Sequence, residues 1–239
     1  MAATSIDPVA RLAERQHWIT PAAEIAAQDA IRAAFEPLGP NAEPVRDALH
    51  GSWLHQPLHA VLTDVPVGAW TAAVVFDAMA AVTDSEKLDS AAGALVLLGL
   101  VGAAGAAITG LNDWADVKES APRRIGAVHA LLNVASTGLF TASAVCRRKA
   151  SSRTTARCLA AVGFAVVSVS AHLGGNLVYE HHVGTVANAE TEAIARDPED
   201  RPMAWADESS QREKNHDKTL ADSFPTSDPP SSIPDPAGD

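Results

Sequence analysis

The sequence predicts an all-α fold, an integral membrane four-helix up-and-down bundle with polar, partly disordered tails. Three long runs contain no Asp, Glu, Lys or Arg, and they cover residues 90–112, 125–146 and 158–179. A helix rises about 1.5 Å per residue, so each run is long enough to cross a hydrocarbon core of roughly 30 Å. A fourth run, 58–82, is interrupted only by Asp64 and Asp77. A soluble helix keeps one polar face, whereas these runs are apolar or small all round, which favours a membrane bundle over a buried soluble one.

Small residues and short connectors are the other two observations that predict this fold. The second run carries Gly99, Gly102 and Gly105 among alanines. In a soluble helix each glycine would cost about 1 kcal/mol, but in lipid small residues let helices approach closely and pack. The connectors 83–87, 113–124 and 147–157 are short enough to join antiparallel neighbours.

The chain is expected to divide into three parts, 1–49, 50–186 and 187–239. The first part is polar and lacks the apolar stretch of a secretory signal peptide. Within it, residues 21–36 predict a short amphipathic helix after a proline start, which either lies on the membrane surface or packs on the rim of the bundle. The last part is acidic and rich in Pro, Ser and Asp, which is typical of a disordered, solvated tail. The net charge of −11 comes largely from these ends and argues against a nucleic-acid partner.

The charge of the connectors suggests an orientation. The 147–157 connector contains five cations and no acid. The positive-inside rule therefore places it on the cytoplasmic side, in what we expect to be a bacterial cytoplasmic membrane, with both termini outside. We expect Trp53, Trp70 and Trp114 to anchor the helices at the membrane interface, and Asp77 to be a helix-end charge that reaches it.

Polar side chains gather at one side of the predicted bundle. Because the helices alternate in direction, the starts of the first and third and the ends of the second and fourth lie together. His129 and His172 would lie at a matched depth, roughly 8–10 Å below that rim. Two such histidines could be axial ligands of haem b or ligands of a metal that the sequence does not identify. Asn133 and Asn176, each four residues further along, could orient the imidazoles or hydrogen-bond a quinone.

His59 and Asp64 complete the expected site. They lie about 140° apart around a regular helix and so do not share a face, although Pro66 complicates the local geometry. Asp64 is costly inside a span unless it is paired, and His129, His172 and Arg124 are the partners that the sequence offers. The candidate cofactor-binding residues are His59, Asp64, His129, Asn133, His172 and Asn176. The alternative is that the histidines only tie helices together by hydrogen bonds worth about 0.6 kcal/mol on average.

Four segments carry a resemblance to a known family. "WLHQPLHAVLTDVPVGAW", "TGLNDWADV", "RRIGAVHALLN" and "GGNLVYEHHVG" together resemble the four-helix membrane domain of unknown function known as family 2231, over residues 50–186. The family's first helix opens with a Gly-His-Pro-x-His-Pro pattern. Here Leu54-His55-Gln56-Pro57 replaces its first half, and Ala60 follows His59. The positions that resemble family motifs are His59, Asp64, Pro66, Asp113, His129, Asn133, Gly174 and Gly175.

Some members are fused to a Rieske iron–sulfur domain, so the resemblance implies a redox setting. This chain contains no Cys-x-His pair of such a domain.

Two functions remain open at this point. The first is a membrane redox module with a His-lined site for haem b, a quinone or a metal, working with a redox protein partner. The second is a non-catalytic scaffold or anchor that recruits partners through its tails and could form a homo-oligomer. A proton or metal conduit is weaker, because no charged residue lies in the roughly 20 Å of helix between Asp64 and Asp77. No hydrolase, P-loop or dinucleotide motif is found, so no catalytic residue is assigned.

Overall fold

A computed structural model describes residues 7–149 and 152–184, and this part of the chain is helical without strands. The helices are α1 (Pro8–Arg15), α2 (Pro21–Ala33), η1 (Glu36–Asn41), α3 (Ala42–His50), η2 (Ser52–Leu54), α4 (Leu58–Thr83), α5 (Glu86–Trp114), α6 (Ser120–Cys146) and α7 (Arg153–Tyr179). The predicted tail over 187–239 lies outside the described residues.

Helices α4 to α7 are the predicted spans, and all four are long and apolar enough to cross a membrane. Three of them begin several residues before the uncharged runs. Helix α5 starts at Glu86 because the Ser85 side chain accepts a hydrogen bond from the Leu88 N–H and caps the helix. Glu86 and Asp89 in its first turn also favour a helix start, since carboxylates complement the positive end of the helix dipole.

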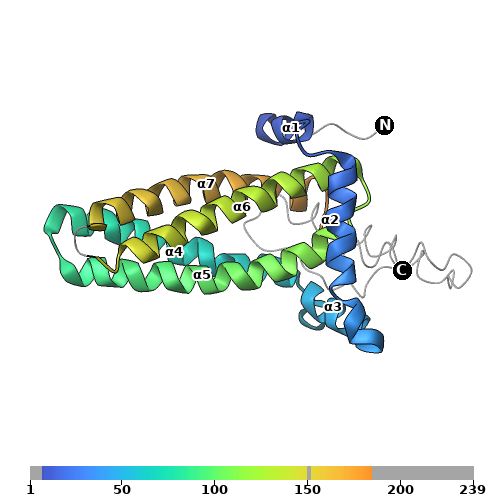
Figure 1. Cartoon of the computed structure of the whole chain (residues 1–239), viewed down its shortest axis with the longest axis horizontal. Coiled ribbons are helices and arrows are strands. Elements are labelled where there is room, and N and C mark those ends of the chain that lie inside the picture. The colour runs from blue at the N-terminus through green and yellow to red at the C-terminus, as the bar shows by residue number, and fades with distance from the viewer. Residues whose placement is uncertain (1–6, 150–151, 185–239) are drawn as a thin grey trace, which may run out of the picture. The chain divides into compact units, whose positions relative to one another are not determined.

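The long helices pack as two hairpins, α4 with α5 and α6 with α7 (Figure 1). Trp70 of α4 and Phe140 of α6 join the hairpins: their rings stack with centroids 4.0 Å apart and planes 10° apart. Trp70 is 2 % exposed, so the prediction that it anchors the membrane interface is wrong. Gly99 of α5 is the physical reason, because a Cβ there would overlap the indole that lies against it.

The two hairpins are copies of one structural unit. The sequence "HAVLTDVPVGAWTAAVV" (59–75) aligns with "HALLNVASTGLFTASAV" (129–145) at His, Ala, Leu, Gly, Thr, Ala and Val, with an aromatic residue at the same place. The contacts repeat too. The Trp70 ring packs on Gly99 and the Phe140 ring packs on the equivalent Gly163 of α7.

Equivalent residues of the two hairpins also meet each other in space. His59 lies beside His129, Trp70 stacks on Phe140, and Asp77 pairs with Arg147. A residue touches its own equivalent only where a twofold axis passes between them. The pairs therefore mark a pseudo-twofold axis that runs through the bundle from the histidines to the ion pair.

Candidate functional site

His59 of α4 is held by the neighbouring helix α5. Its Nδ1 lies 2.8 Å from the Ala106 carbonyl oxygen. A carbonyl only accepts, so Nδ1 carries the proton and Nε2 keeps its lone pair. Within the described residues Nε2 has no hydrogen-bond partner. Gly110 lets the ring lie directly against α5, because a Cβ there would come 2.6 Å from the ring.

His129 of α6 is held in the same way by α7. Its Nδ1 lies 2.7 Å from the Ser170 carbonyl oxygen, and the Ser170 hydroxyl donates to the His129 carbonyl at 3.0 Å. Gly174 faces this ring as Gly110 faces His59. Since Nδ1 donates, Nε2 must accept, and the Asn133 amide nitrogen lies 3.0 Å from it. Both nitrogens of His129 are therefore hydrogen-bonded.

The two imidazoles face each other across the pseudo-twofold axis. Their ring centroids are 6.4 Å apart and their planes are 86° apart. Both rings are half-buried in the interior of the bundle. The arrangement offers one free Nε2 lone pair, on His59, and a second one that the Asn133 side chain covers. Within the described residues, no group of three His, Cys, Asp or Glu could hold a metal ion, so any metal here would rely on the imidazole pair.

The structure separates the other candidate residues from this pair. His172 is exposed, and its Nε2 forms an ion pair with Asp7 before α1. Helical geometry explains this: Ser170 faces His129, and a residue two positions later points about 200° away. Asp64 is exposed on the outer face of α4, and Asn176 is buried on α7. None of His129, His172 and Arg124 pairs with Asp64. The structure thus brings together His59, His129 and Asn133, and leaves Asp64 and His172 on outer surfaces.

Ser170 and Ala106 are site residues that the sequence analysis missed. Ala106 contributes only a backbone carbonyl, which every residue type has, so its identity in the sequence does not indicate this role. Comparing the chain with itself would have provided the missing signal, because it aligns His59 with His129 rather than His129 with His172.

The N-terminal helices pack on the end of the bundle where the histidines lie. Glu24 of α2 is buried between the guanidinium groups of Arg123 and Arg124 of α6. The Gln28 amide donates to the carbonyls of Trp114 and Val117 at 2.9 Å. The predicted amphipathic helix therefore forms over 21–33 and packs on the rim through its polar residues, which is one of its two expected positions.

A polar cluster also attaches α3 to the end of α5. Nδ1 of His50 lies 2.5 Å from an Asp113 carboxylate oxygen, and the Arg46 guanidinium lies 2.6 Å from Asp116. The hydrogen bond to Asp113 raises the pKa of His50, although partial burial acts in the opposite direction. On the opposite side of the rim, desolvation would raise the pKa of Asp7. Hydrogen bonds from the N–H groups of Val9 and Ala10 and from His172 lower it overall.

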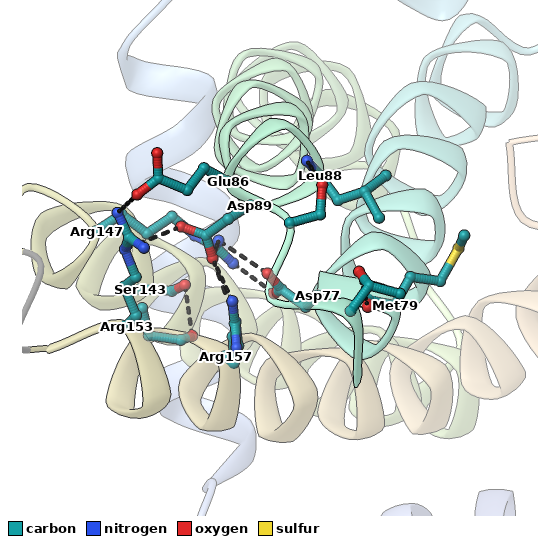
Figure 2. A network of polar contacts seen from close by, with 12 residues as sticks. Asp77, Met79, Glu86, Leu88, Asp89, Ser143, Arg147, Arg153 and Arg157 are labelled. Atoms are coloured by element: carbon teal, nitrogen blue, oxygen red, sulfur yellow. Dashed lines mark hydrogen bonds and ion pairs between the residues drawn. The ribbon is translucent and has the colours of Figure 1, made fainter. Parts of the chain in front are cut away.

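The far end of the bundle holds an ion-pair network (Figure 2). Asp77 is 4 % exposed and accepts two hydrogen bonds from the Arg147 guanidinium, at 2.9 and 2.5 Å. Asp89 contacts Arg153 at 3.5 Å and Arg157 at 2.9 Å. We expected Asp77 to be a helix-end charge that reaches the membrane interface; the structure instead buries it in an ion pair with Arg147, which occupies the equivalent position of the second hairpin.

Comparison with known families agrees with this architecture. The model of the family DUF2231, described as a predicted membrane protein, matches residues 55–187. The chain belongs to the DUF2231 family. The matched residues contain all four apolar helices, so this DUF2231 protein is a multi-pass integral membrane protein. No curated protein and no solved structure matches the chain significantly.

Proposed function

We propose that this DUF2231 protein is a redox-associated membrane module that binds a metal-containing cofactor between His59 and His129, with haem b as the first candidate. One observation carries the proposal. Two imidazoles from equivalent positions of the two hairpins face each other, and a backbone carbonyl of an adjacent helix holds Nδ1 of each.

The geometry of the pair fits two ligands of one metal ion. Metal-bound histidines typically donate the other ring N–H to a carbonyl or carboxylate, which fixes the ring and raises its basicity. In both rings Nδ1 is engaged in this way, so Nε2 of His59 and Nε2 of His129 are the atoms that would hold the metal ion.

Asn133 controls access to His129 in this arrangement. Its amide must leave Nε2 before that lone pair can bind a metal. Gly110 and Gly174 let the two rings lie directly against α5 and α7, and the Ala106 and Ser170 carbonyls fix the orientation of the rings. A haem held by these two histidines would supply one-electron transfer, which a redox protein partner at this rim would use.

A non-catalytic scaffold is the second candidate, and one observation favours it. Both nitrogens of His129 are already hydrogen-bonded, as is the hydroxyl of Ser170. Such a network can be purely structural, with the His129–Ser170 hydrogen bonds tying α6 to α7. In this case the tails would carry the function by recruiting partners.

A reduced-minus-oxidised absorption spectrum of the detergent-purified full chain distinguishes the haem-binding module from the scaffold. We expect a Soret band and sharpened visible bands in the wild type. His59→Ala and His129→Ala should each abolish them, because each removes one of the two side chains that would hold the haem. His172→Ala is the matched control: it lies at similar depth but on the outer surface, and its spectrum should not change. A flat wild-type spectrum together with no bound transition metal by elemental analysis would leave the scaffold.

We also propose that the 147–157 connector lies on the cytoplasmic side of a bacterial cytoplasmic membrane, with both termini outside. Arg148 and Lys149 add two cations to the three arginines that are ion-paired at this end. A periplasmic alkaline phosphatase reporter fused at the C-terminus should be active, and a fluorescent protein that folds only in the cytoplasm should stay dark. The reverse result would invert the orientation.

A further inference from the structure

Asp64 is a carboxylate on the outside of a membrane-spanning helix. It is exposed on α4, and within the described residues it makes no hydrogen bond or ion pair. Ionisable residues within spans normally face the interior of a bundle and are paired, because an unpaired charge is costly in hydrocarbon. The position of Asp64 is therefore the reverse of what a membrane bundle requires for its own stability.

The packing places Asp64 near the middle of the membrane. A Cβ on Gly102 of α5 would lie 2.7 Å from Val65 and 2.8 Å from Pro66, so Gly102 is level with the residues that follow Asp64. Gly102 is next to the midpoint of the uncharged run 90–112. Asp64 is thus too deep for its short side chain to reach either interface, unlike a long Lys or Arg that extends to the headgroups.

The rest of the chain offers this carboxylate no cation. In the described part of the spans, every Lys and Arg lies at a helix end, and most of these are ion-paired there. The equivalent position of the second hairpin is Val134, which is also exposed. The acid is therefore not required by the repeated fold, since the other copy presents an apolar residue at the same place.

We propose that the outer face of α4 around Asp64 binds a transmembrane helix of another protein, one that carries a Lys or Arg near mid-membrane. Pairing with a cation removes the cost of the lone carboxylate. The residues one turn away on either side are Ala60 and Gly68, and a Cβ on Gly68 would have nothing within 4 Å. Small residues at this spacing let a partner backbone approach closely.

A second copy of this chain is a poorer occupant of the same face. Two copies related by a twofold axis through this face would bring Asp64 against Asp64, and like charges repel. No exposed Lys or Arg of the described spans lies at that depth to replace the missing cation. Charge complementarity therefore points to a different, basic helix.

The test uses a synthetic poly-leucine transmembrane peptide with one central lysine, and a matched peptide with leucine in its place. The full chain, with a fluorescent donor on the exposed Cys158 and Cys146→Ser, is reconstituted in phosphatidylcholine vesicles with acceptor-labelled peptide. We expect the lysine peptide to bind about tenfold more tightly than the leucine peptide. Asp64→Val should remove that difference. The variant should keep its fold, because Asp64 contacts no other polar group within the described residues.

A transplanted carboxylate provides the matched control. In the Asp64→Val chain, Val134→Asp places the acid at the equivalent depth on the other hairpin, and lysine-peptide binding should return. Equal binding of the two peptides by the wild type would overturn the proposal. So would energy transfer between differently labelled copies of the chain that disappears in Asp64→Asn, because it would assign the face to a second copy. Gel filtration verifies that each variant is folded.

Discussion

Ring side chains in this protein lie where the facing helix has a glycine and therefore no side chain. Gly99, Gly110, Gly163 and Gly174 each receive an aromatic or imidazole ring from the facing helix. The histidines differ in their surroundings for the same reason. His59 and His129 are held inside by carbonyls next to such glycines, whereas His172 and His50 pair with the carboxylates of Asp7 and Asp113.

His50 gives a residue-scale prediction for the dependence of stability on pH. Its pKa is raised in the folded protein, so its pairing with Asp113 stabilises fully below the ordinary histidine value of about 6.5. That stability is lost as the pH rises through the raised pKa. The side chain is 33 % exposed, so screening limits the effect to about 0.5 kcal/mol.

The melting temperature of the detergent-solubilised protein, recorded between pH 6 and pH 8, measures this effect, because a histidine side chain changes its charge in this range. The wild type should lose stability towards pH 8, and His50→Ala should show a smaller loss. All other ionisable groups are common to both proteins, so the difference between the two curves measures the contribution of His50. Parallel curves for the two proteins would rule out a contribution from this pair.

At the scale of elements, three of the four spanning helices begin before their uncharged runs begin. Helix α5 extends outward to its Ser85 cap, and α7 begins at Arg153, which pairs with Glu86 and Asp89 at the start of α5. Helix α2 contains an exposed face of small residues, yet it packs through Glu24 and Gln28. The uncharged runs predicted four elements correctly because burial in lipid forbids charge. Helices α1, with eight residues, and α3, with nine, are shorter than the window of about 11–18 residues over which an apolar period is read, so the sequence analysis did not predict them.

At the scale of the whole molecule, the pseudo-twofold arrangement predicts that Asp77 and Arg147 are exchangeable. Either Asp77→Arg or Arg147→Asp alone leaves like charges facing each other in a buried site. Breaking a buried pair costs about 3–5 kcal/mol, so each single variant should be strongly destabilised. The double exchange restores opposite charges at equivalent positions and should recover much of the loss. Recovery is expected to be partial, because Arg147 also lies 4.0 Å from Asp89.

Thermal stability and the yield of monodisperse protein report on this exchange. Asp47→Arg, which reverses an exposed acid of α3 that forms no ion pair within the described residues, is the control for a change of charge alone. If the double variant is no more stable than the worse single variant, the two positions are not equivalent and the proposed axis does not relate them.

The sequence by itself determined the membrane class, the four spans and their antiparallel order. These features depend on the composition and length of each segment, which can be read from that segment without knowing what it packs against. It also determined that His59 and Asp64 face different ways, because that follows from helical geometry alone.

Tertiary structure alone decided which polar side chains meet. His129 faces His59 instead of His172, and Asp77 faces Arg147, because the two hairpins pack about an axis that joins equivalent positions. Trp70 lies inside because the facing helix has a glycine at that level. Helix rotation and register are set by such contacts between helices, and a hydropathy pattern that is apolar all round each helix carries no information about them.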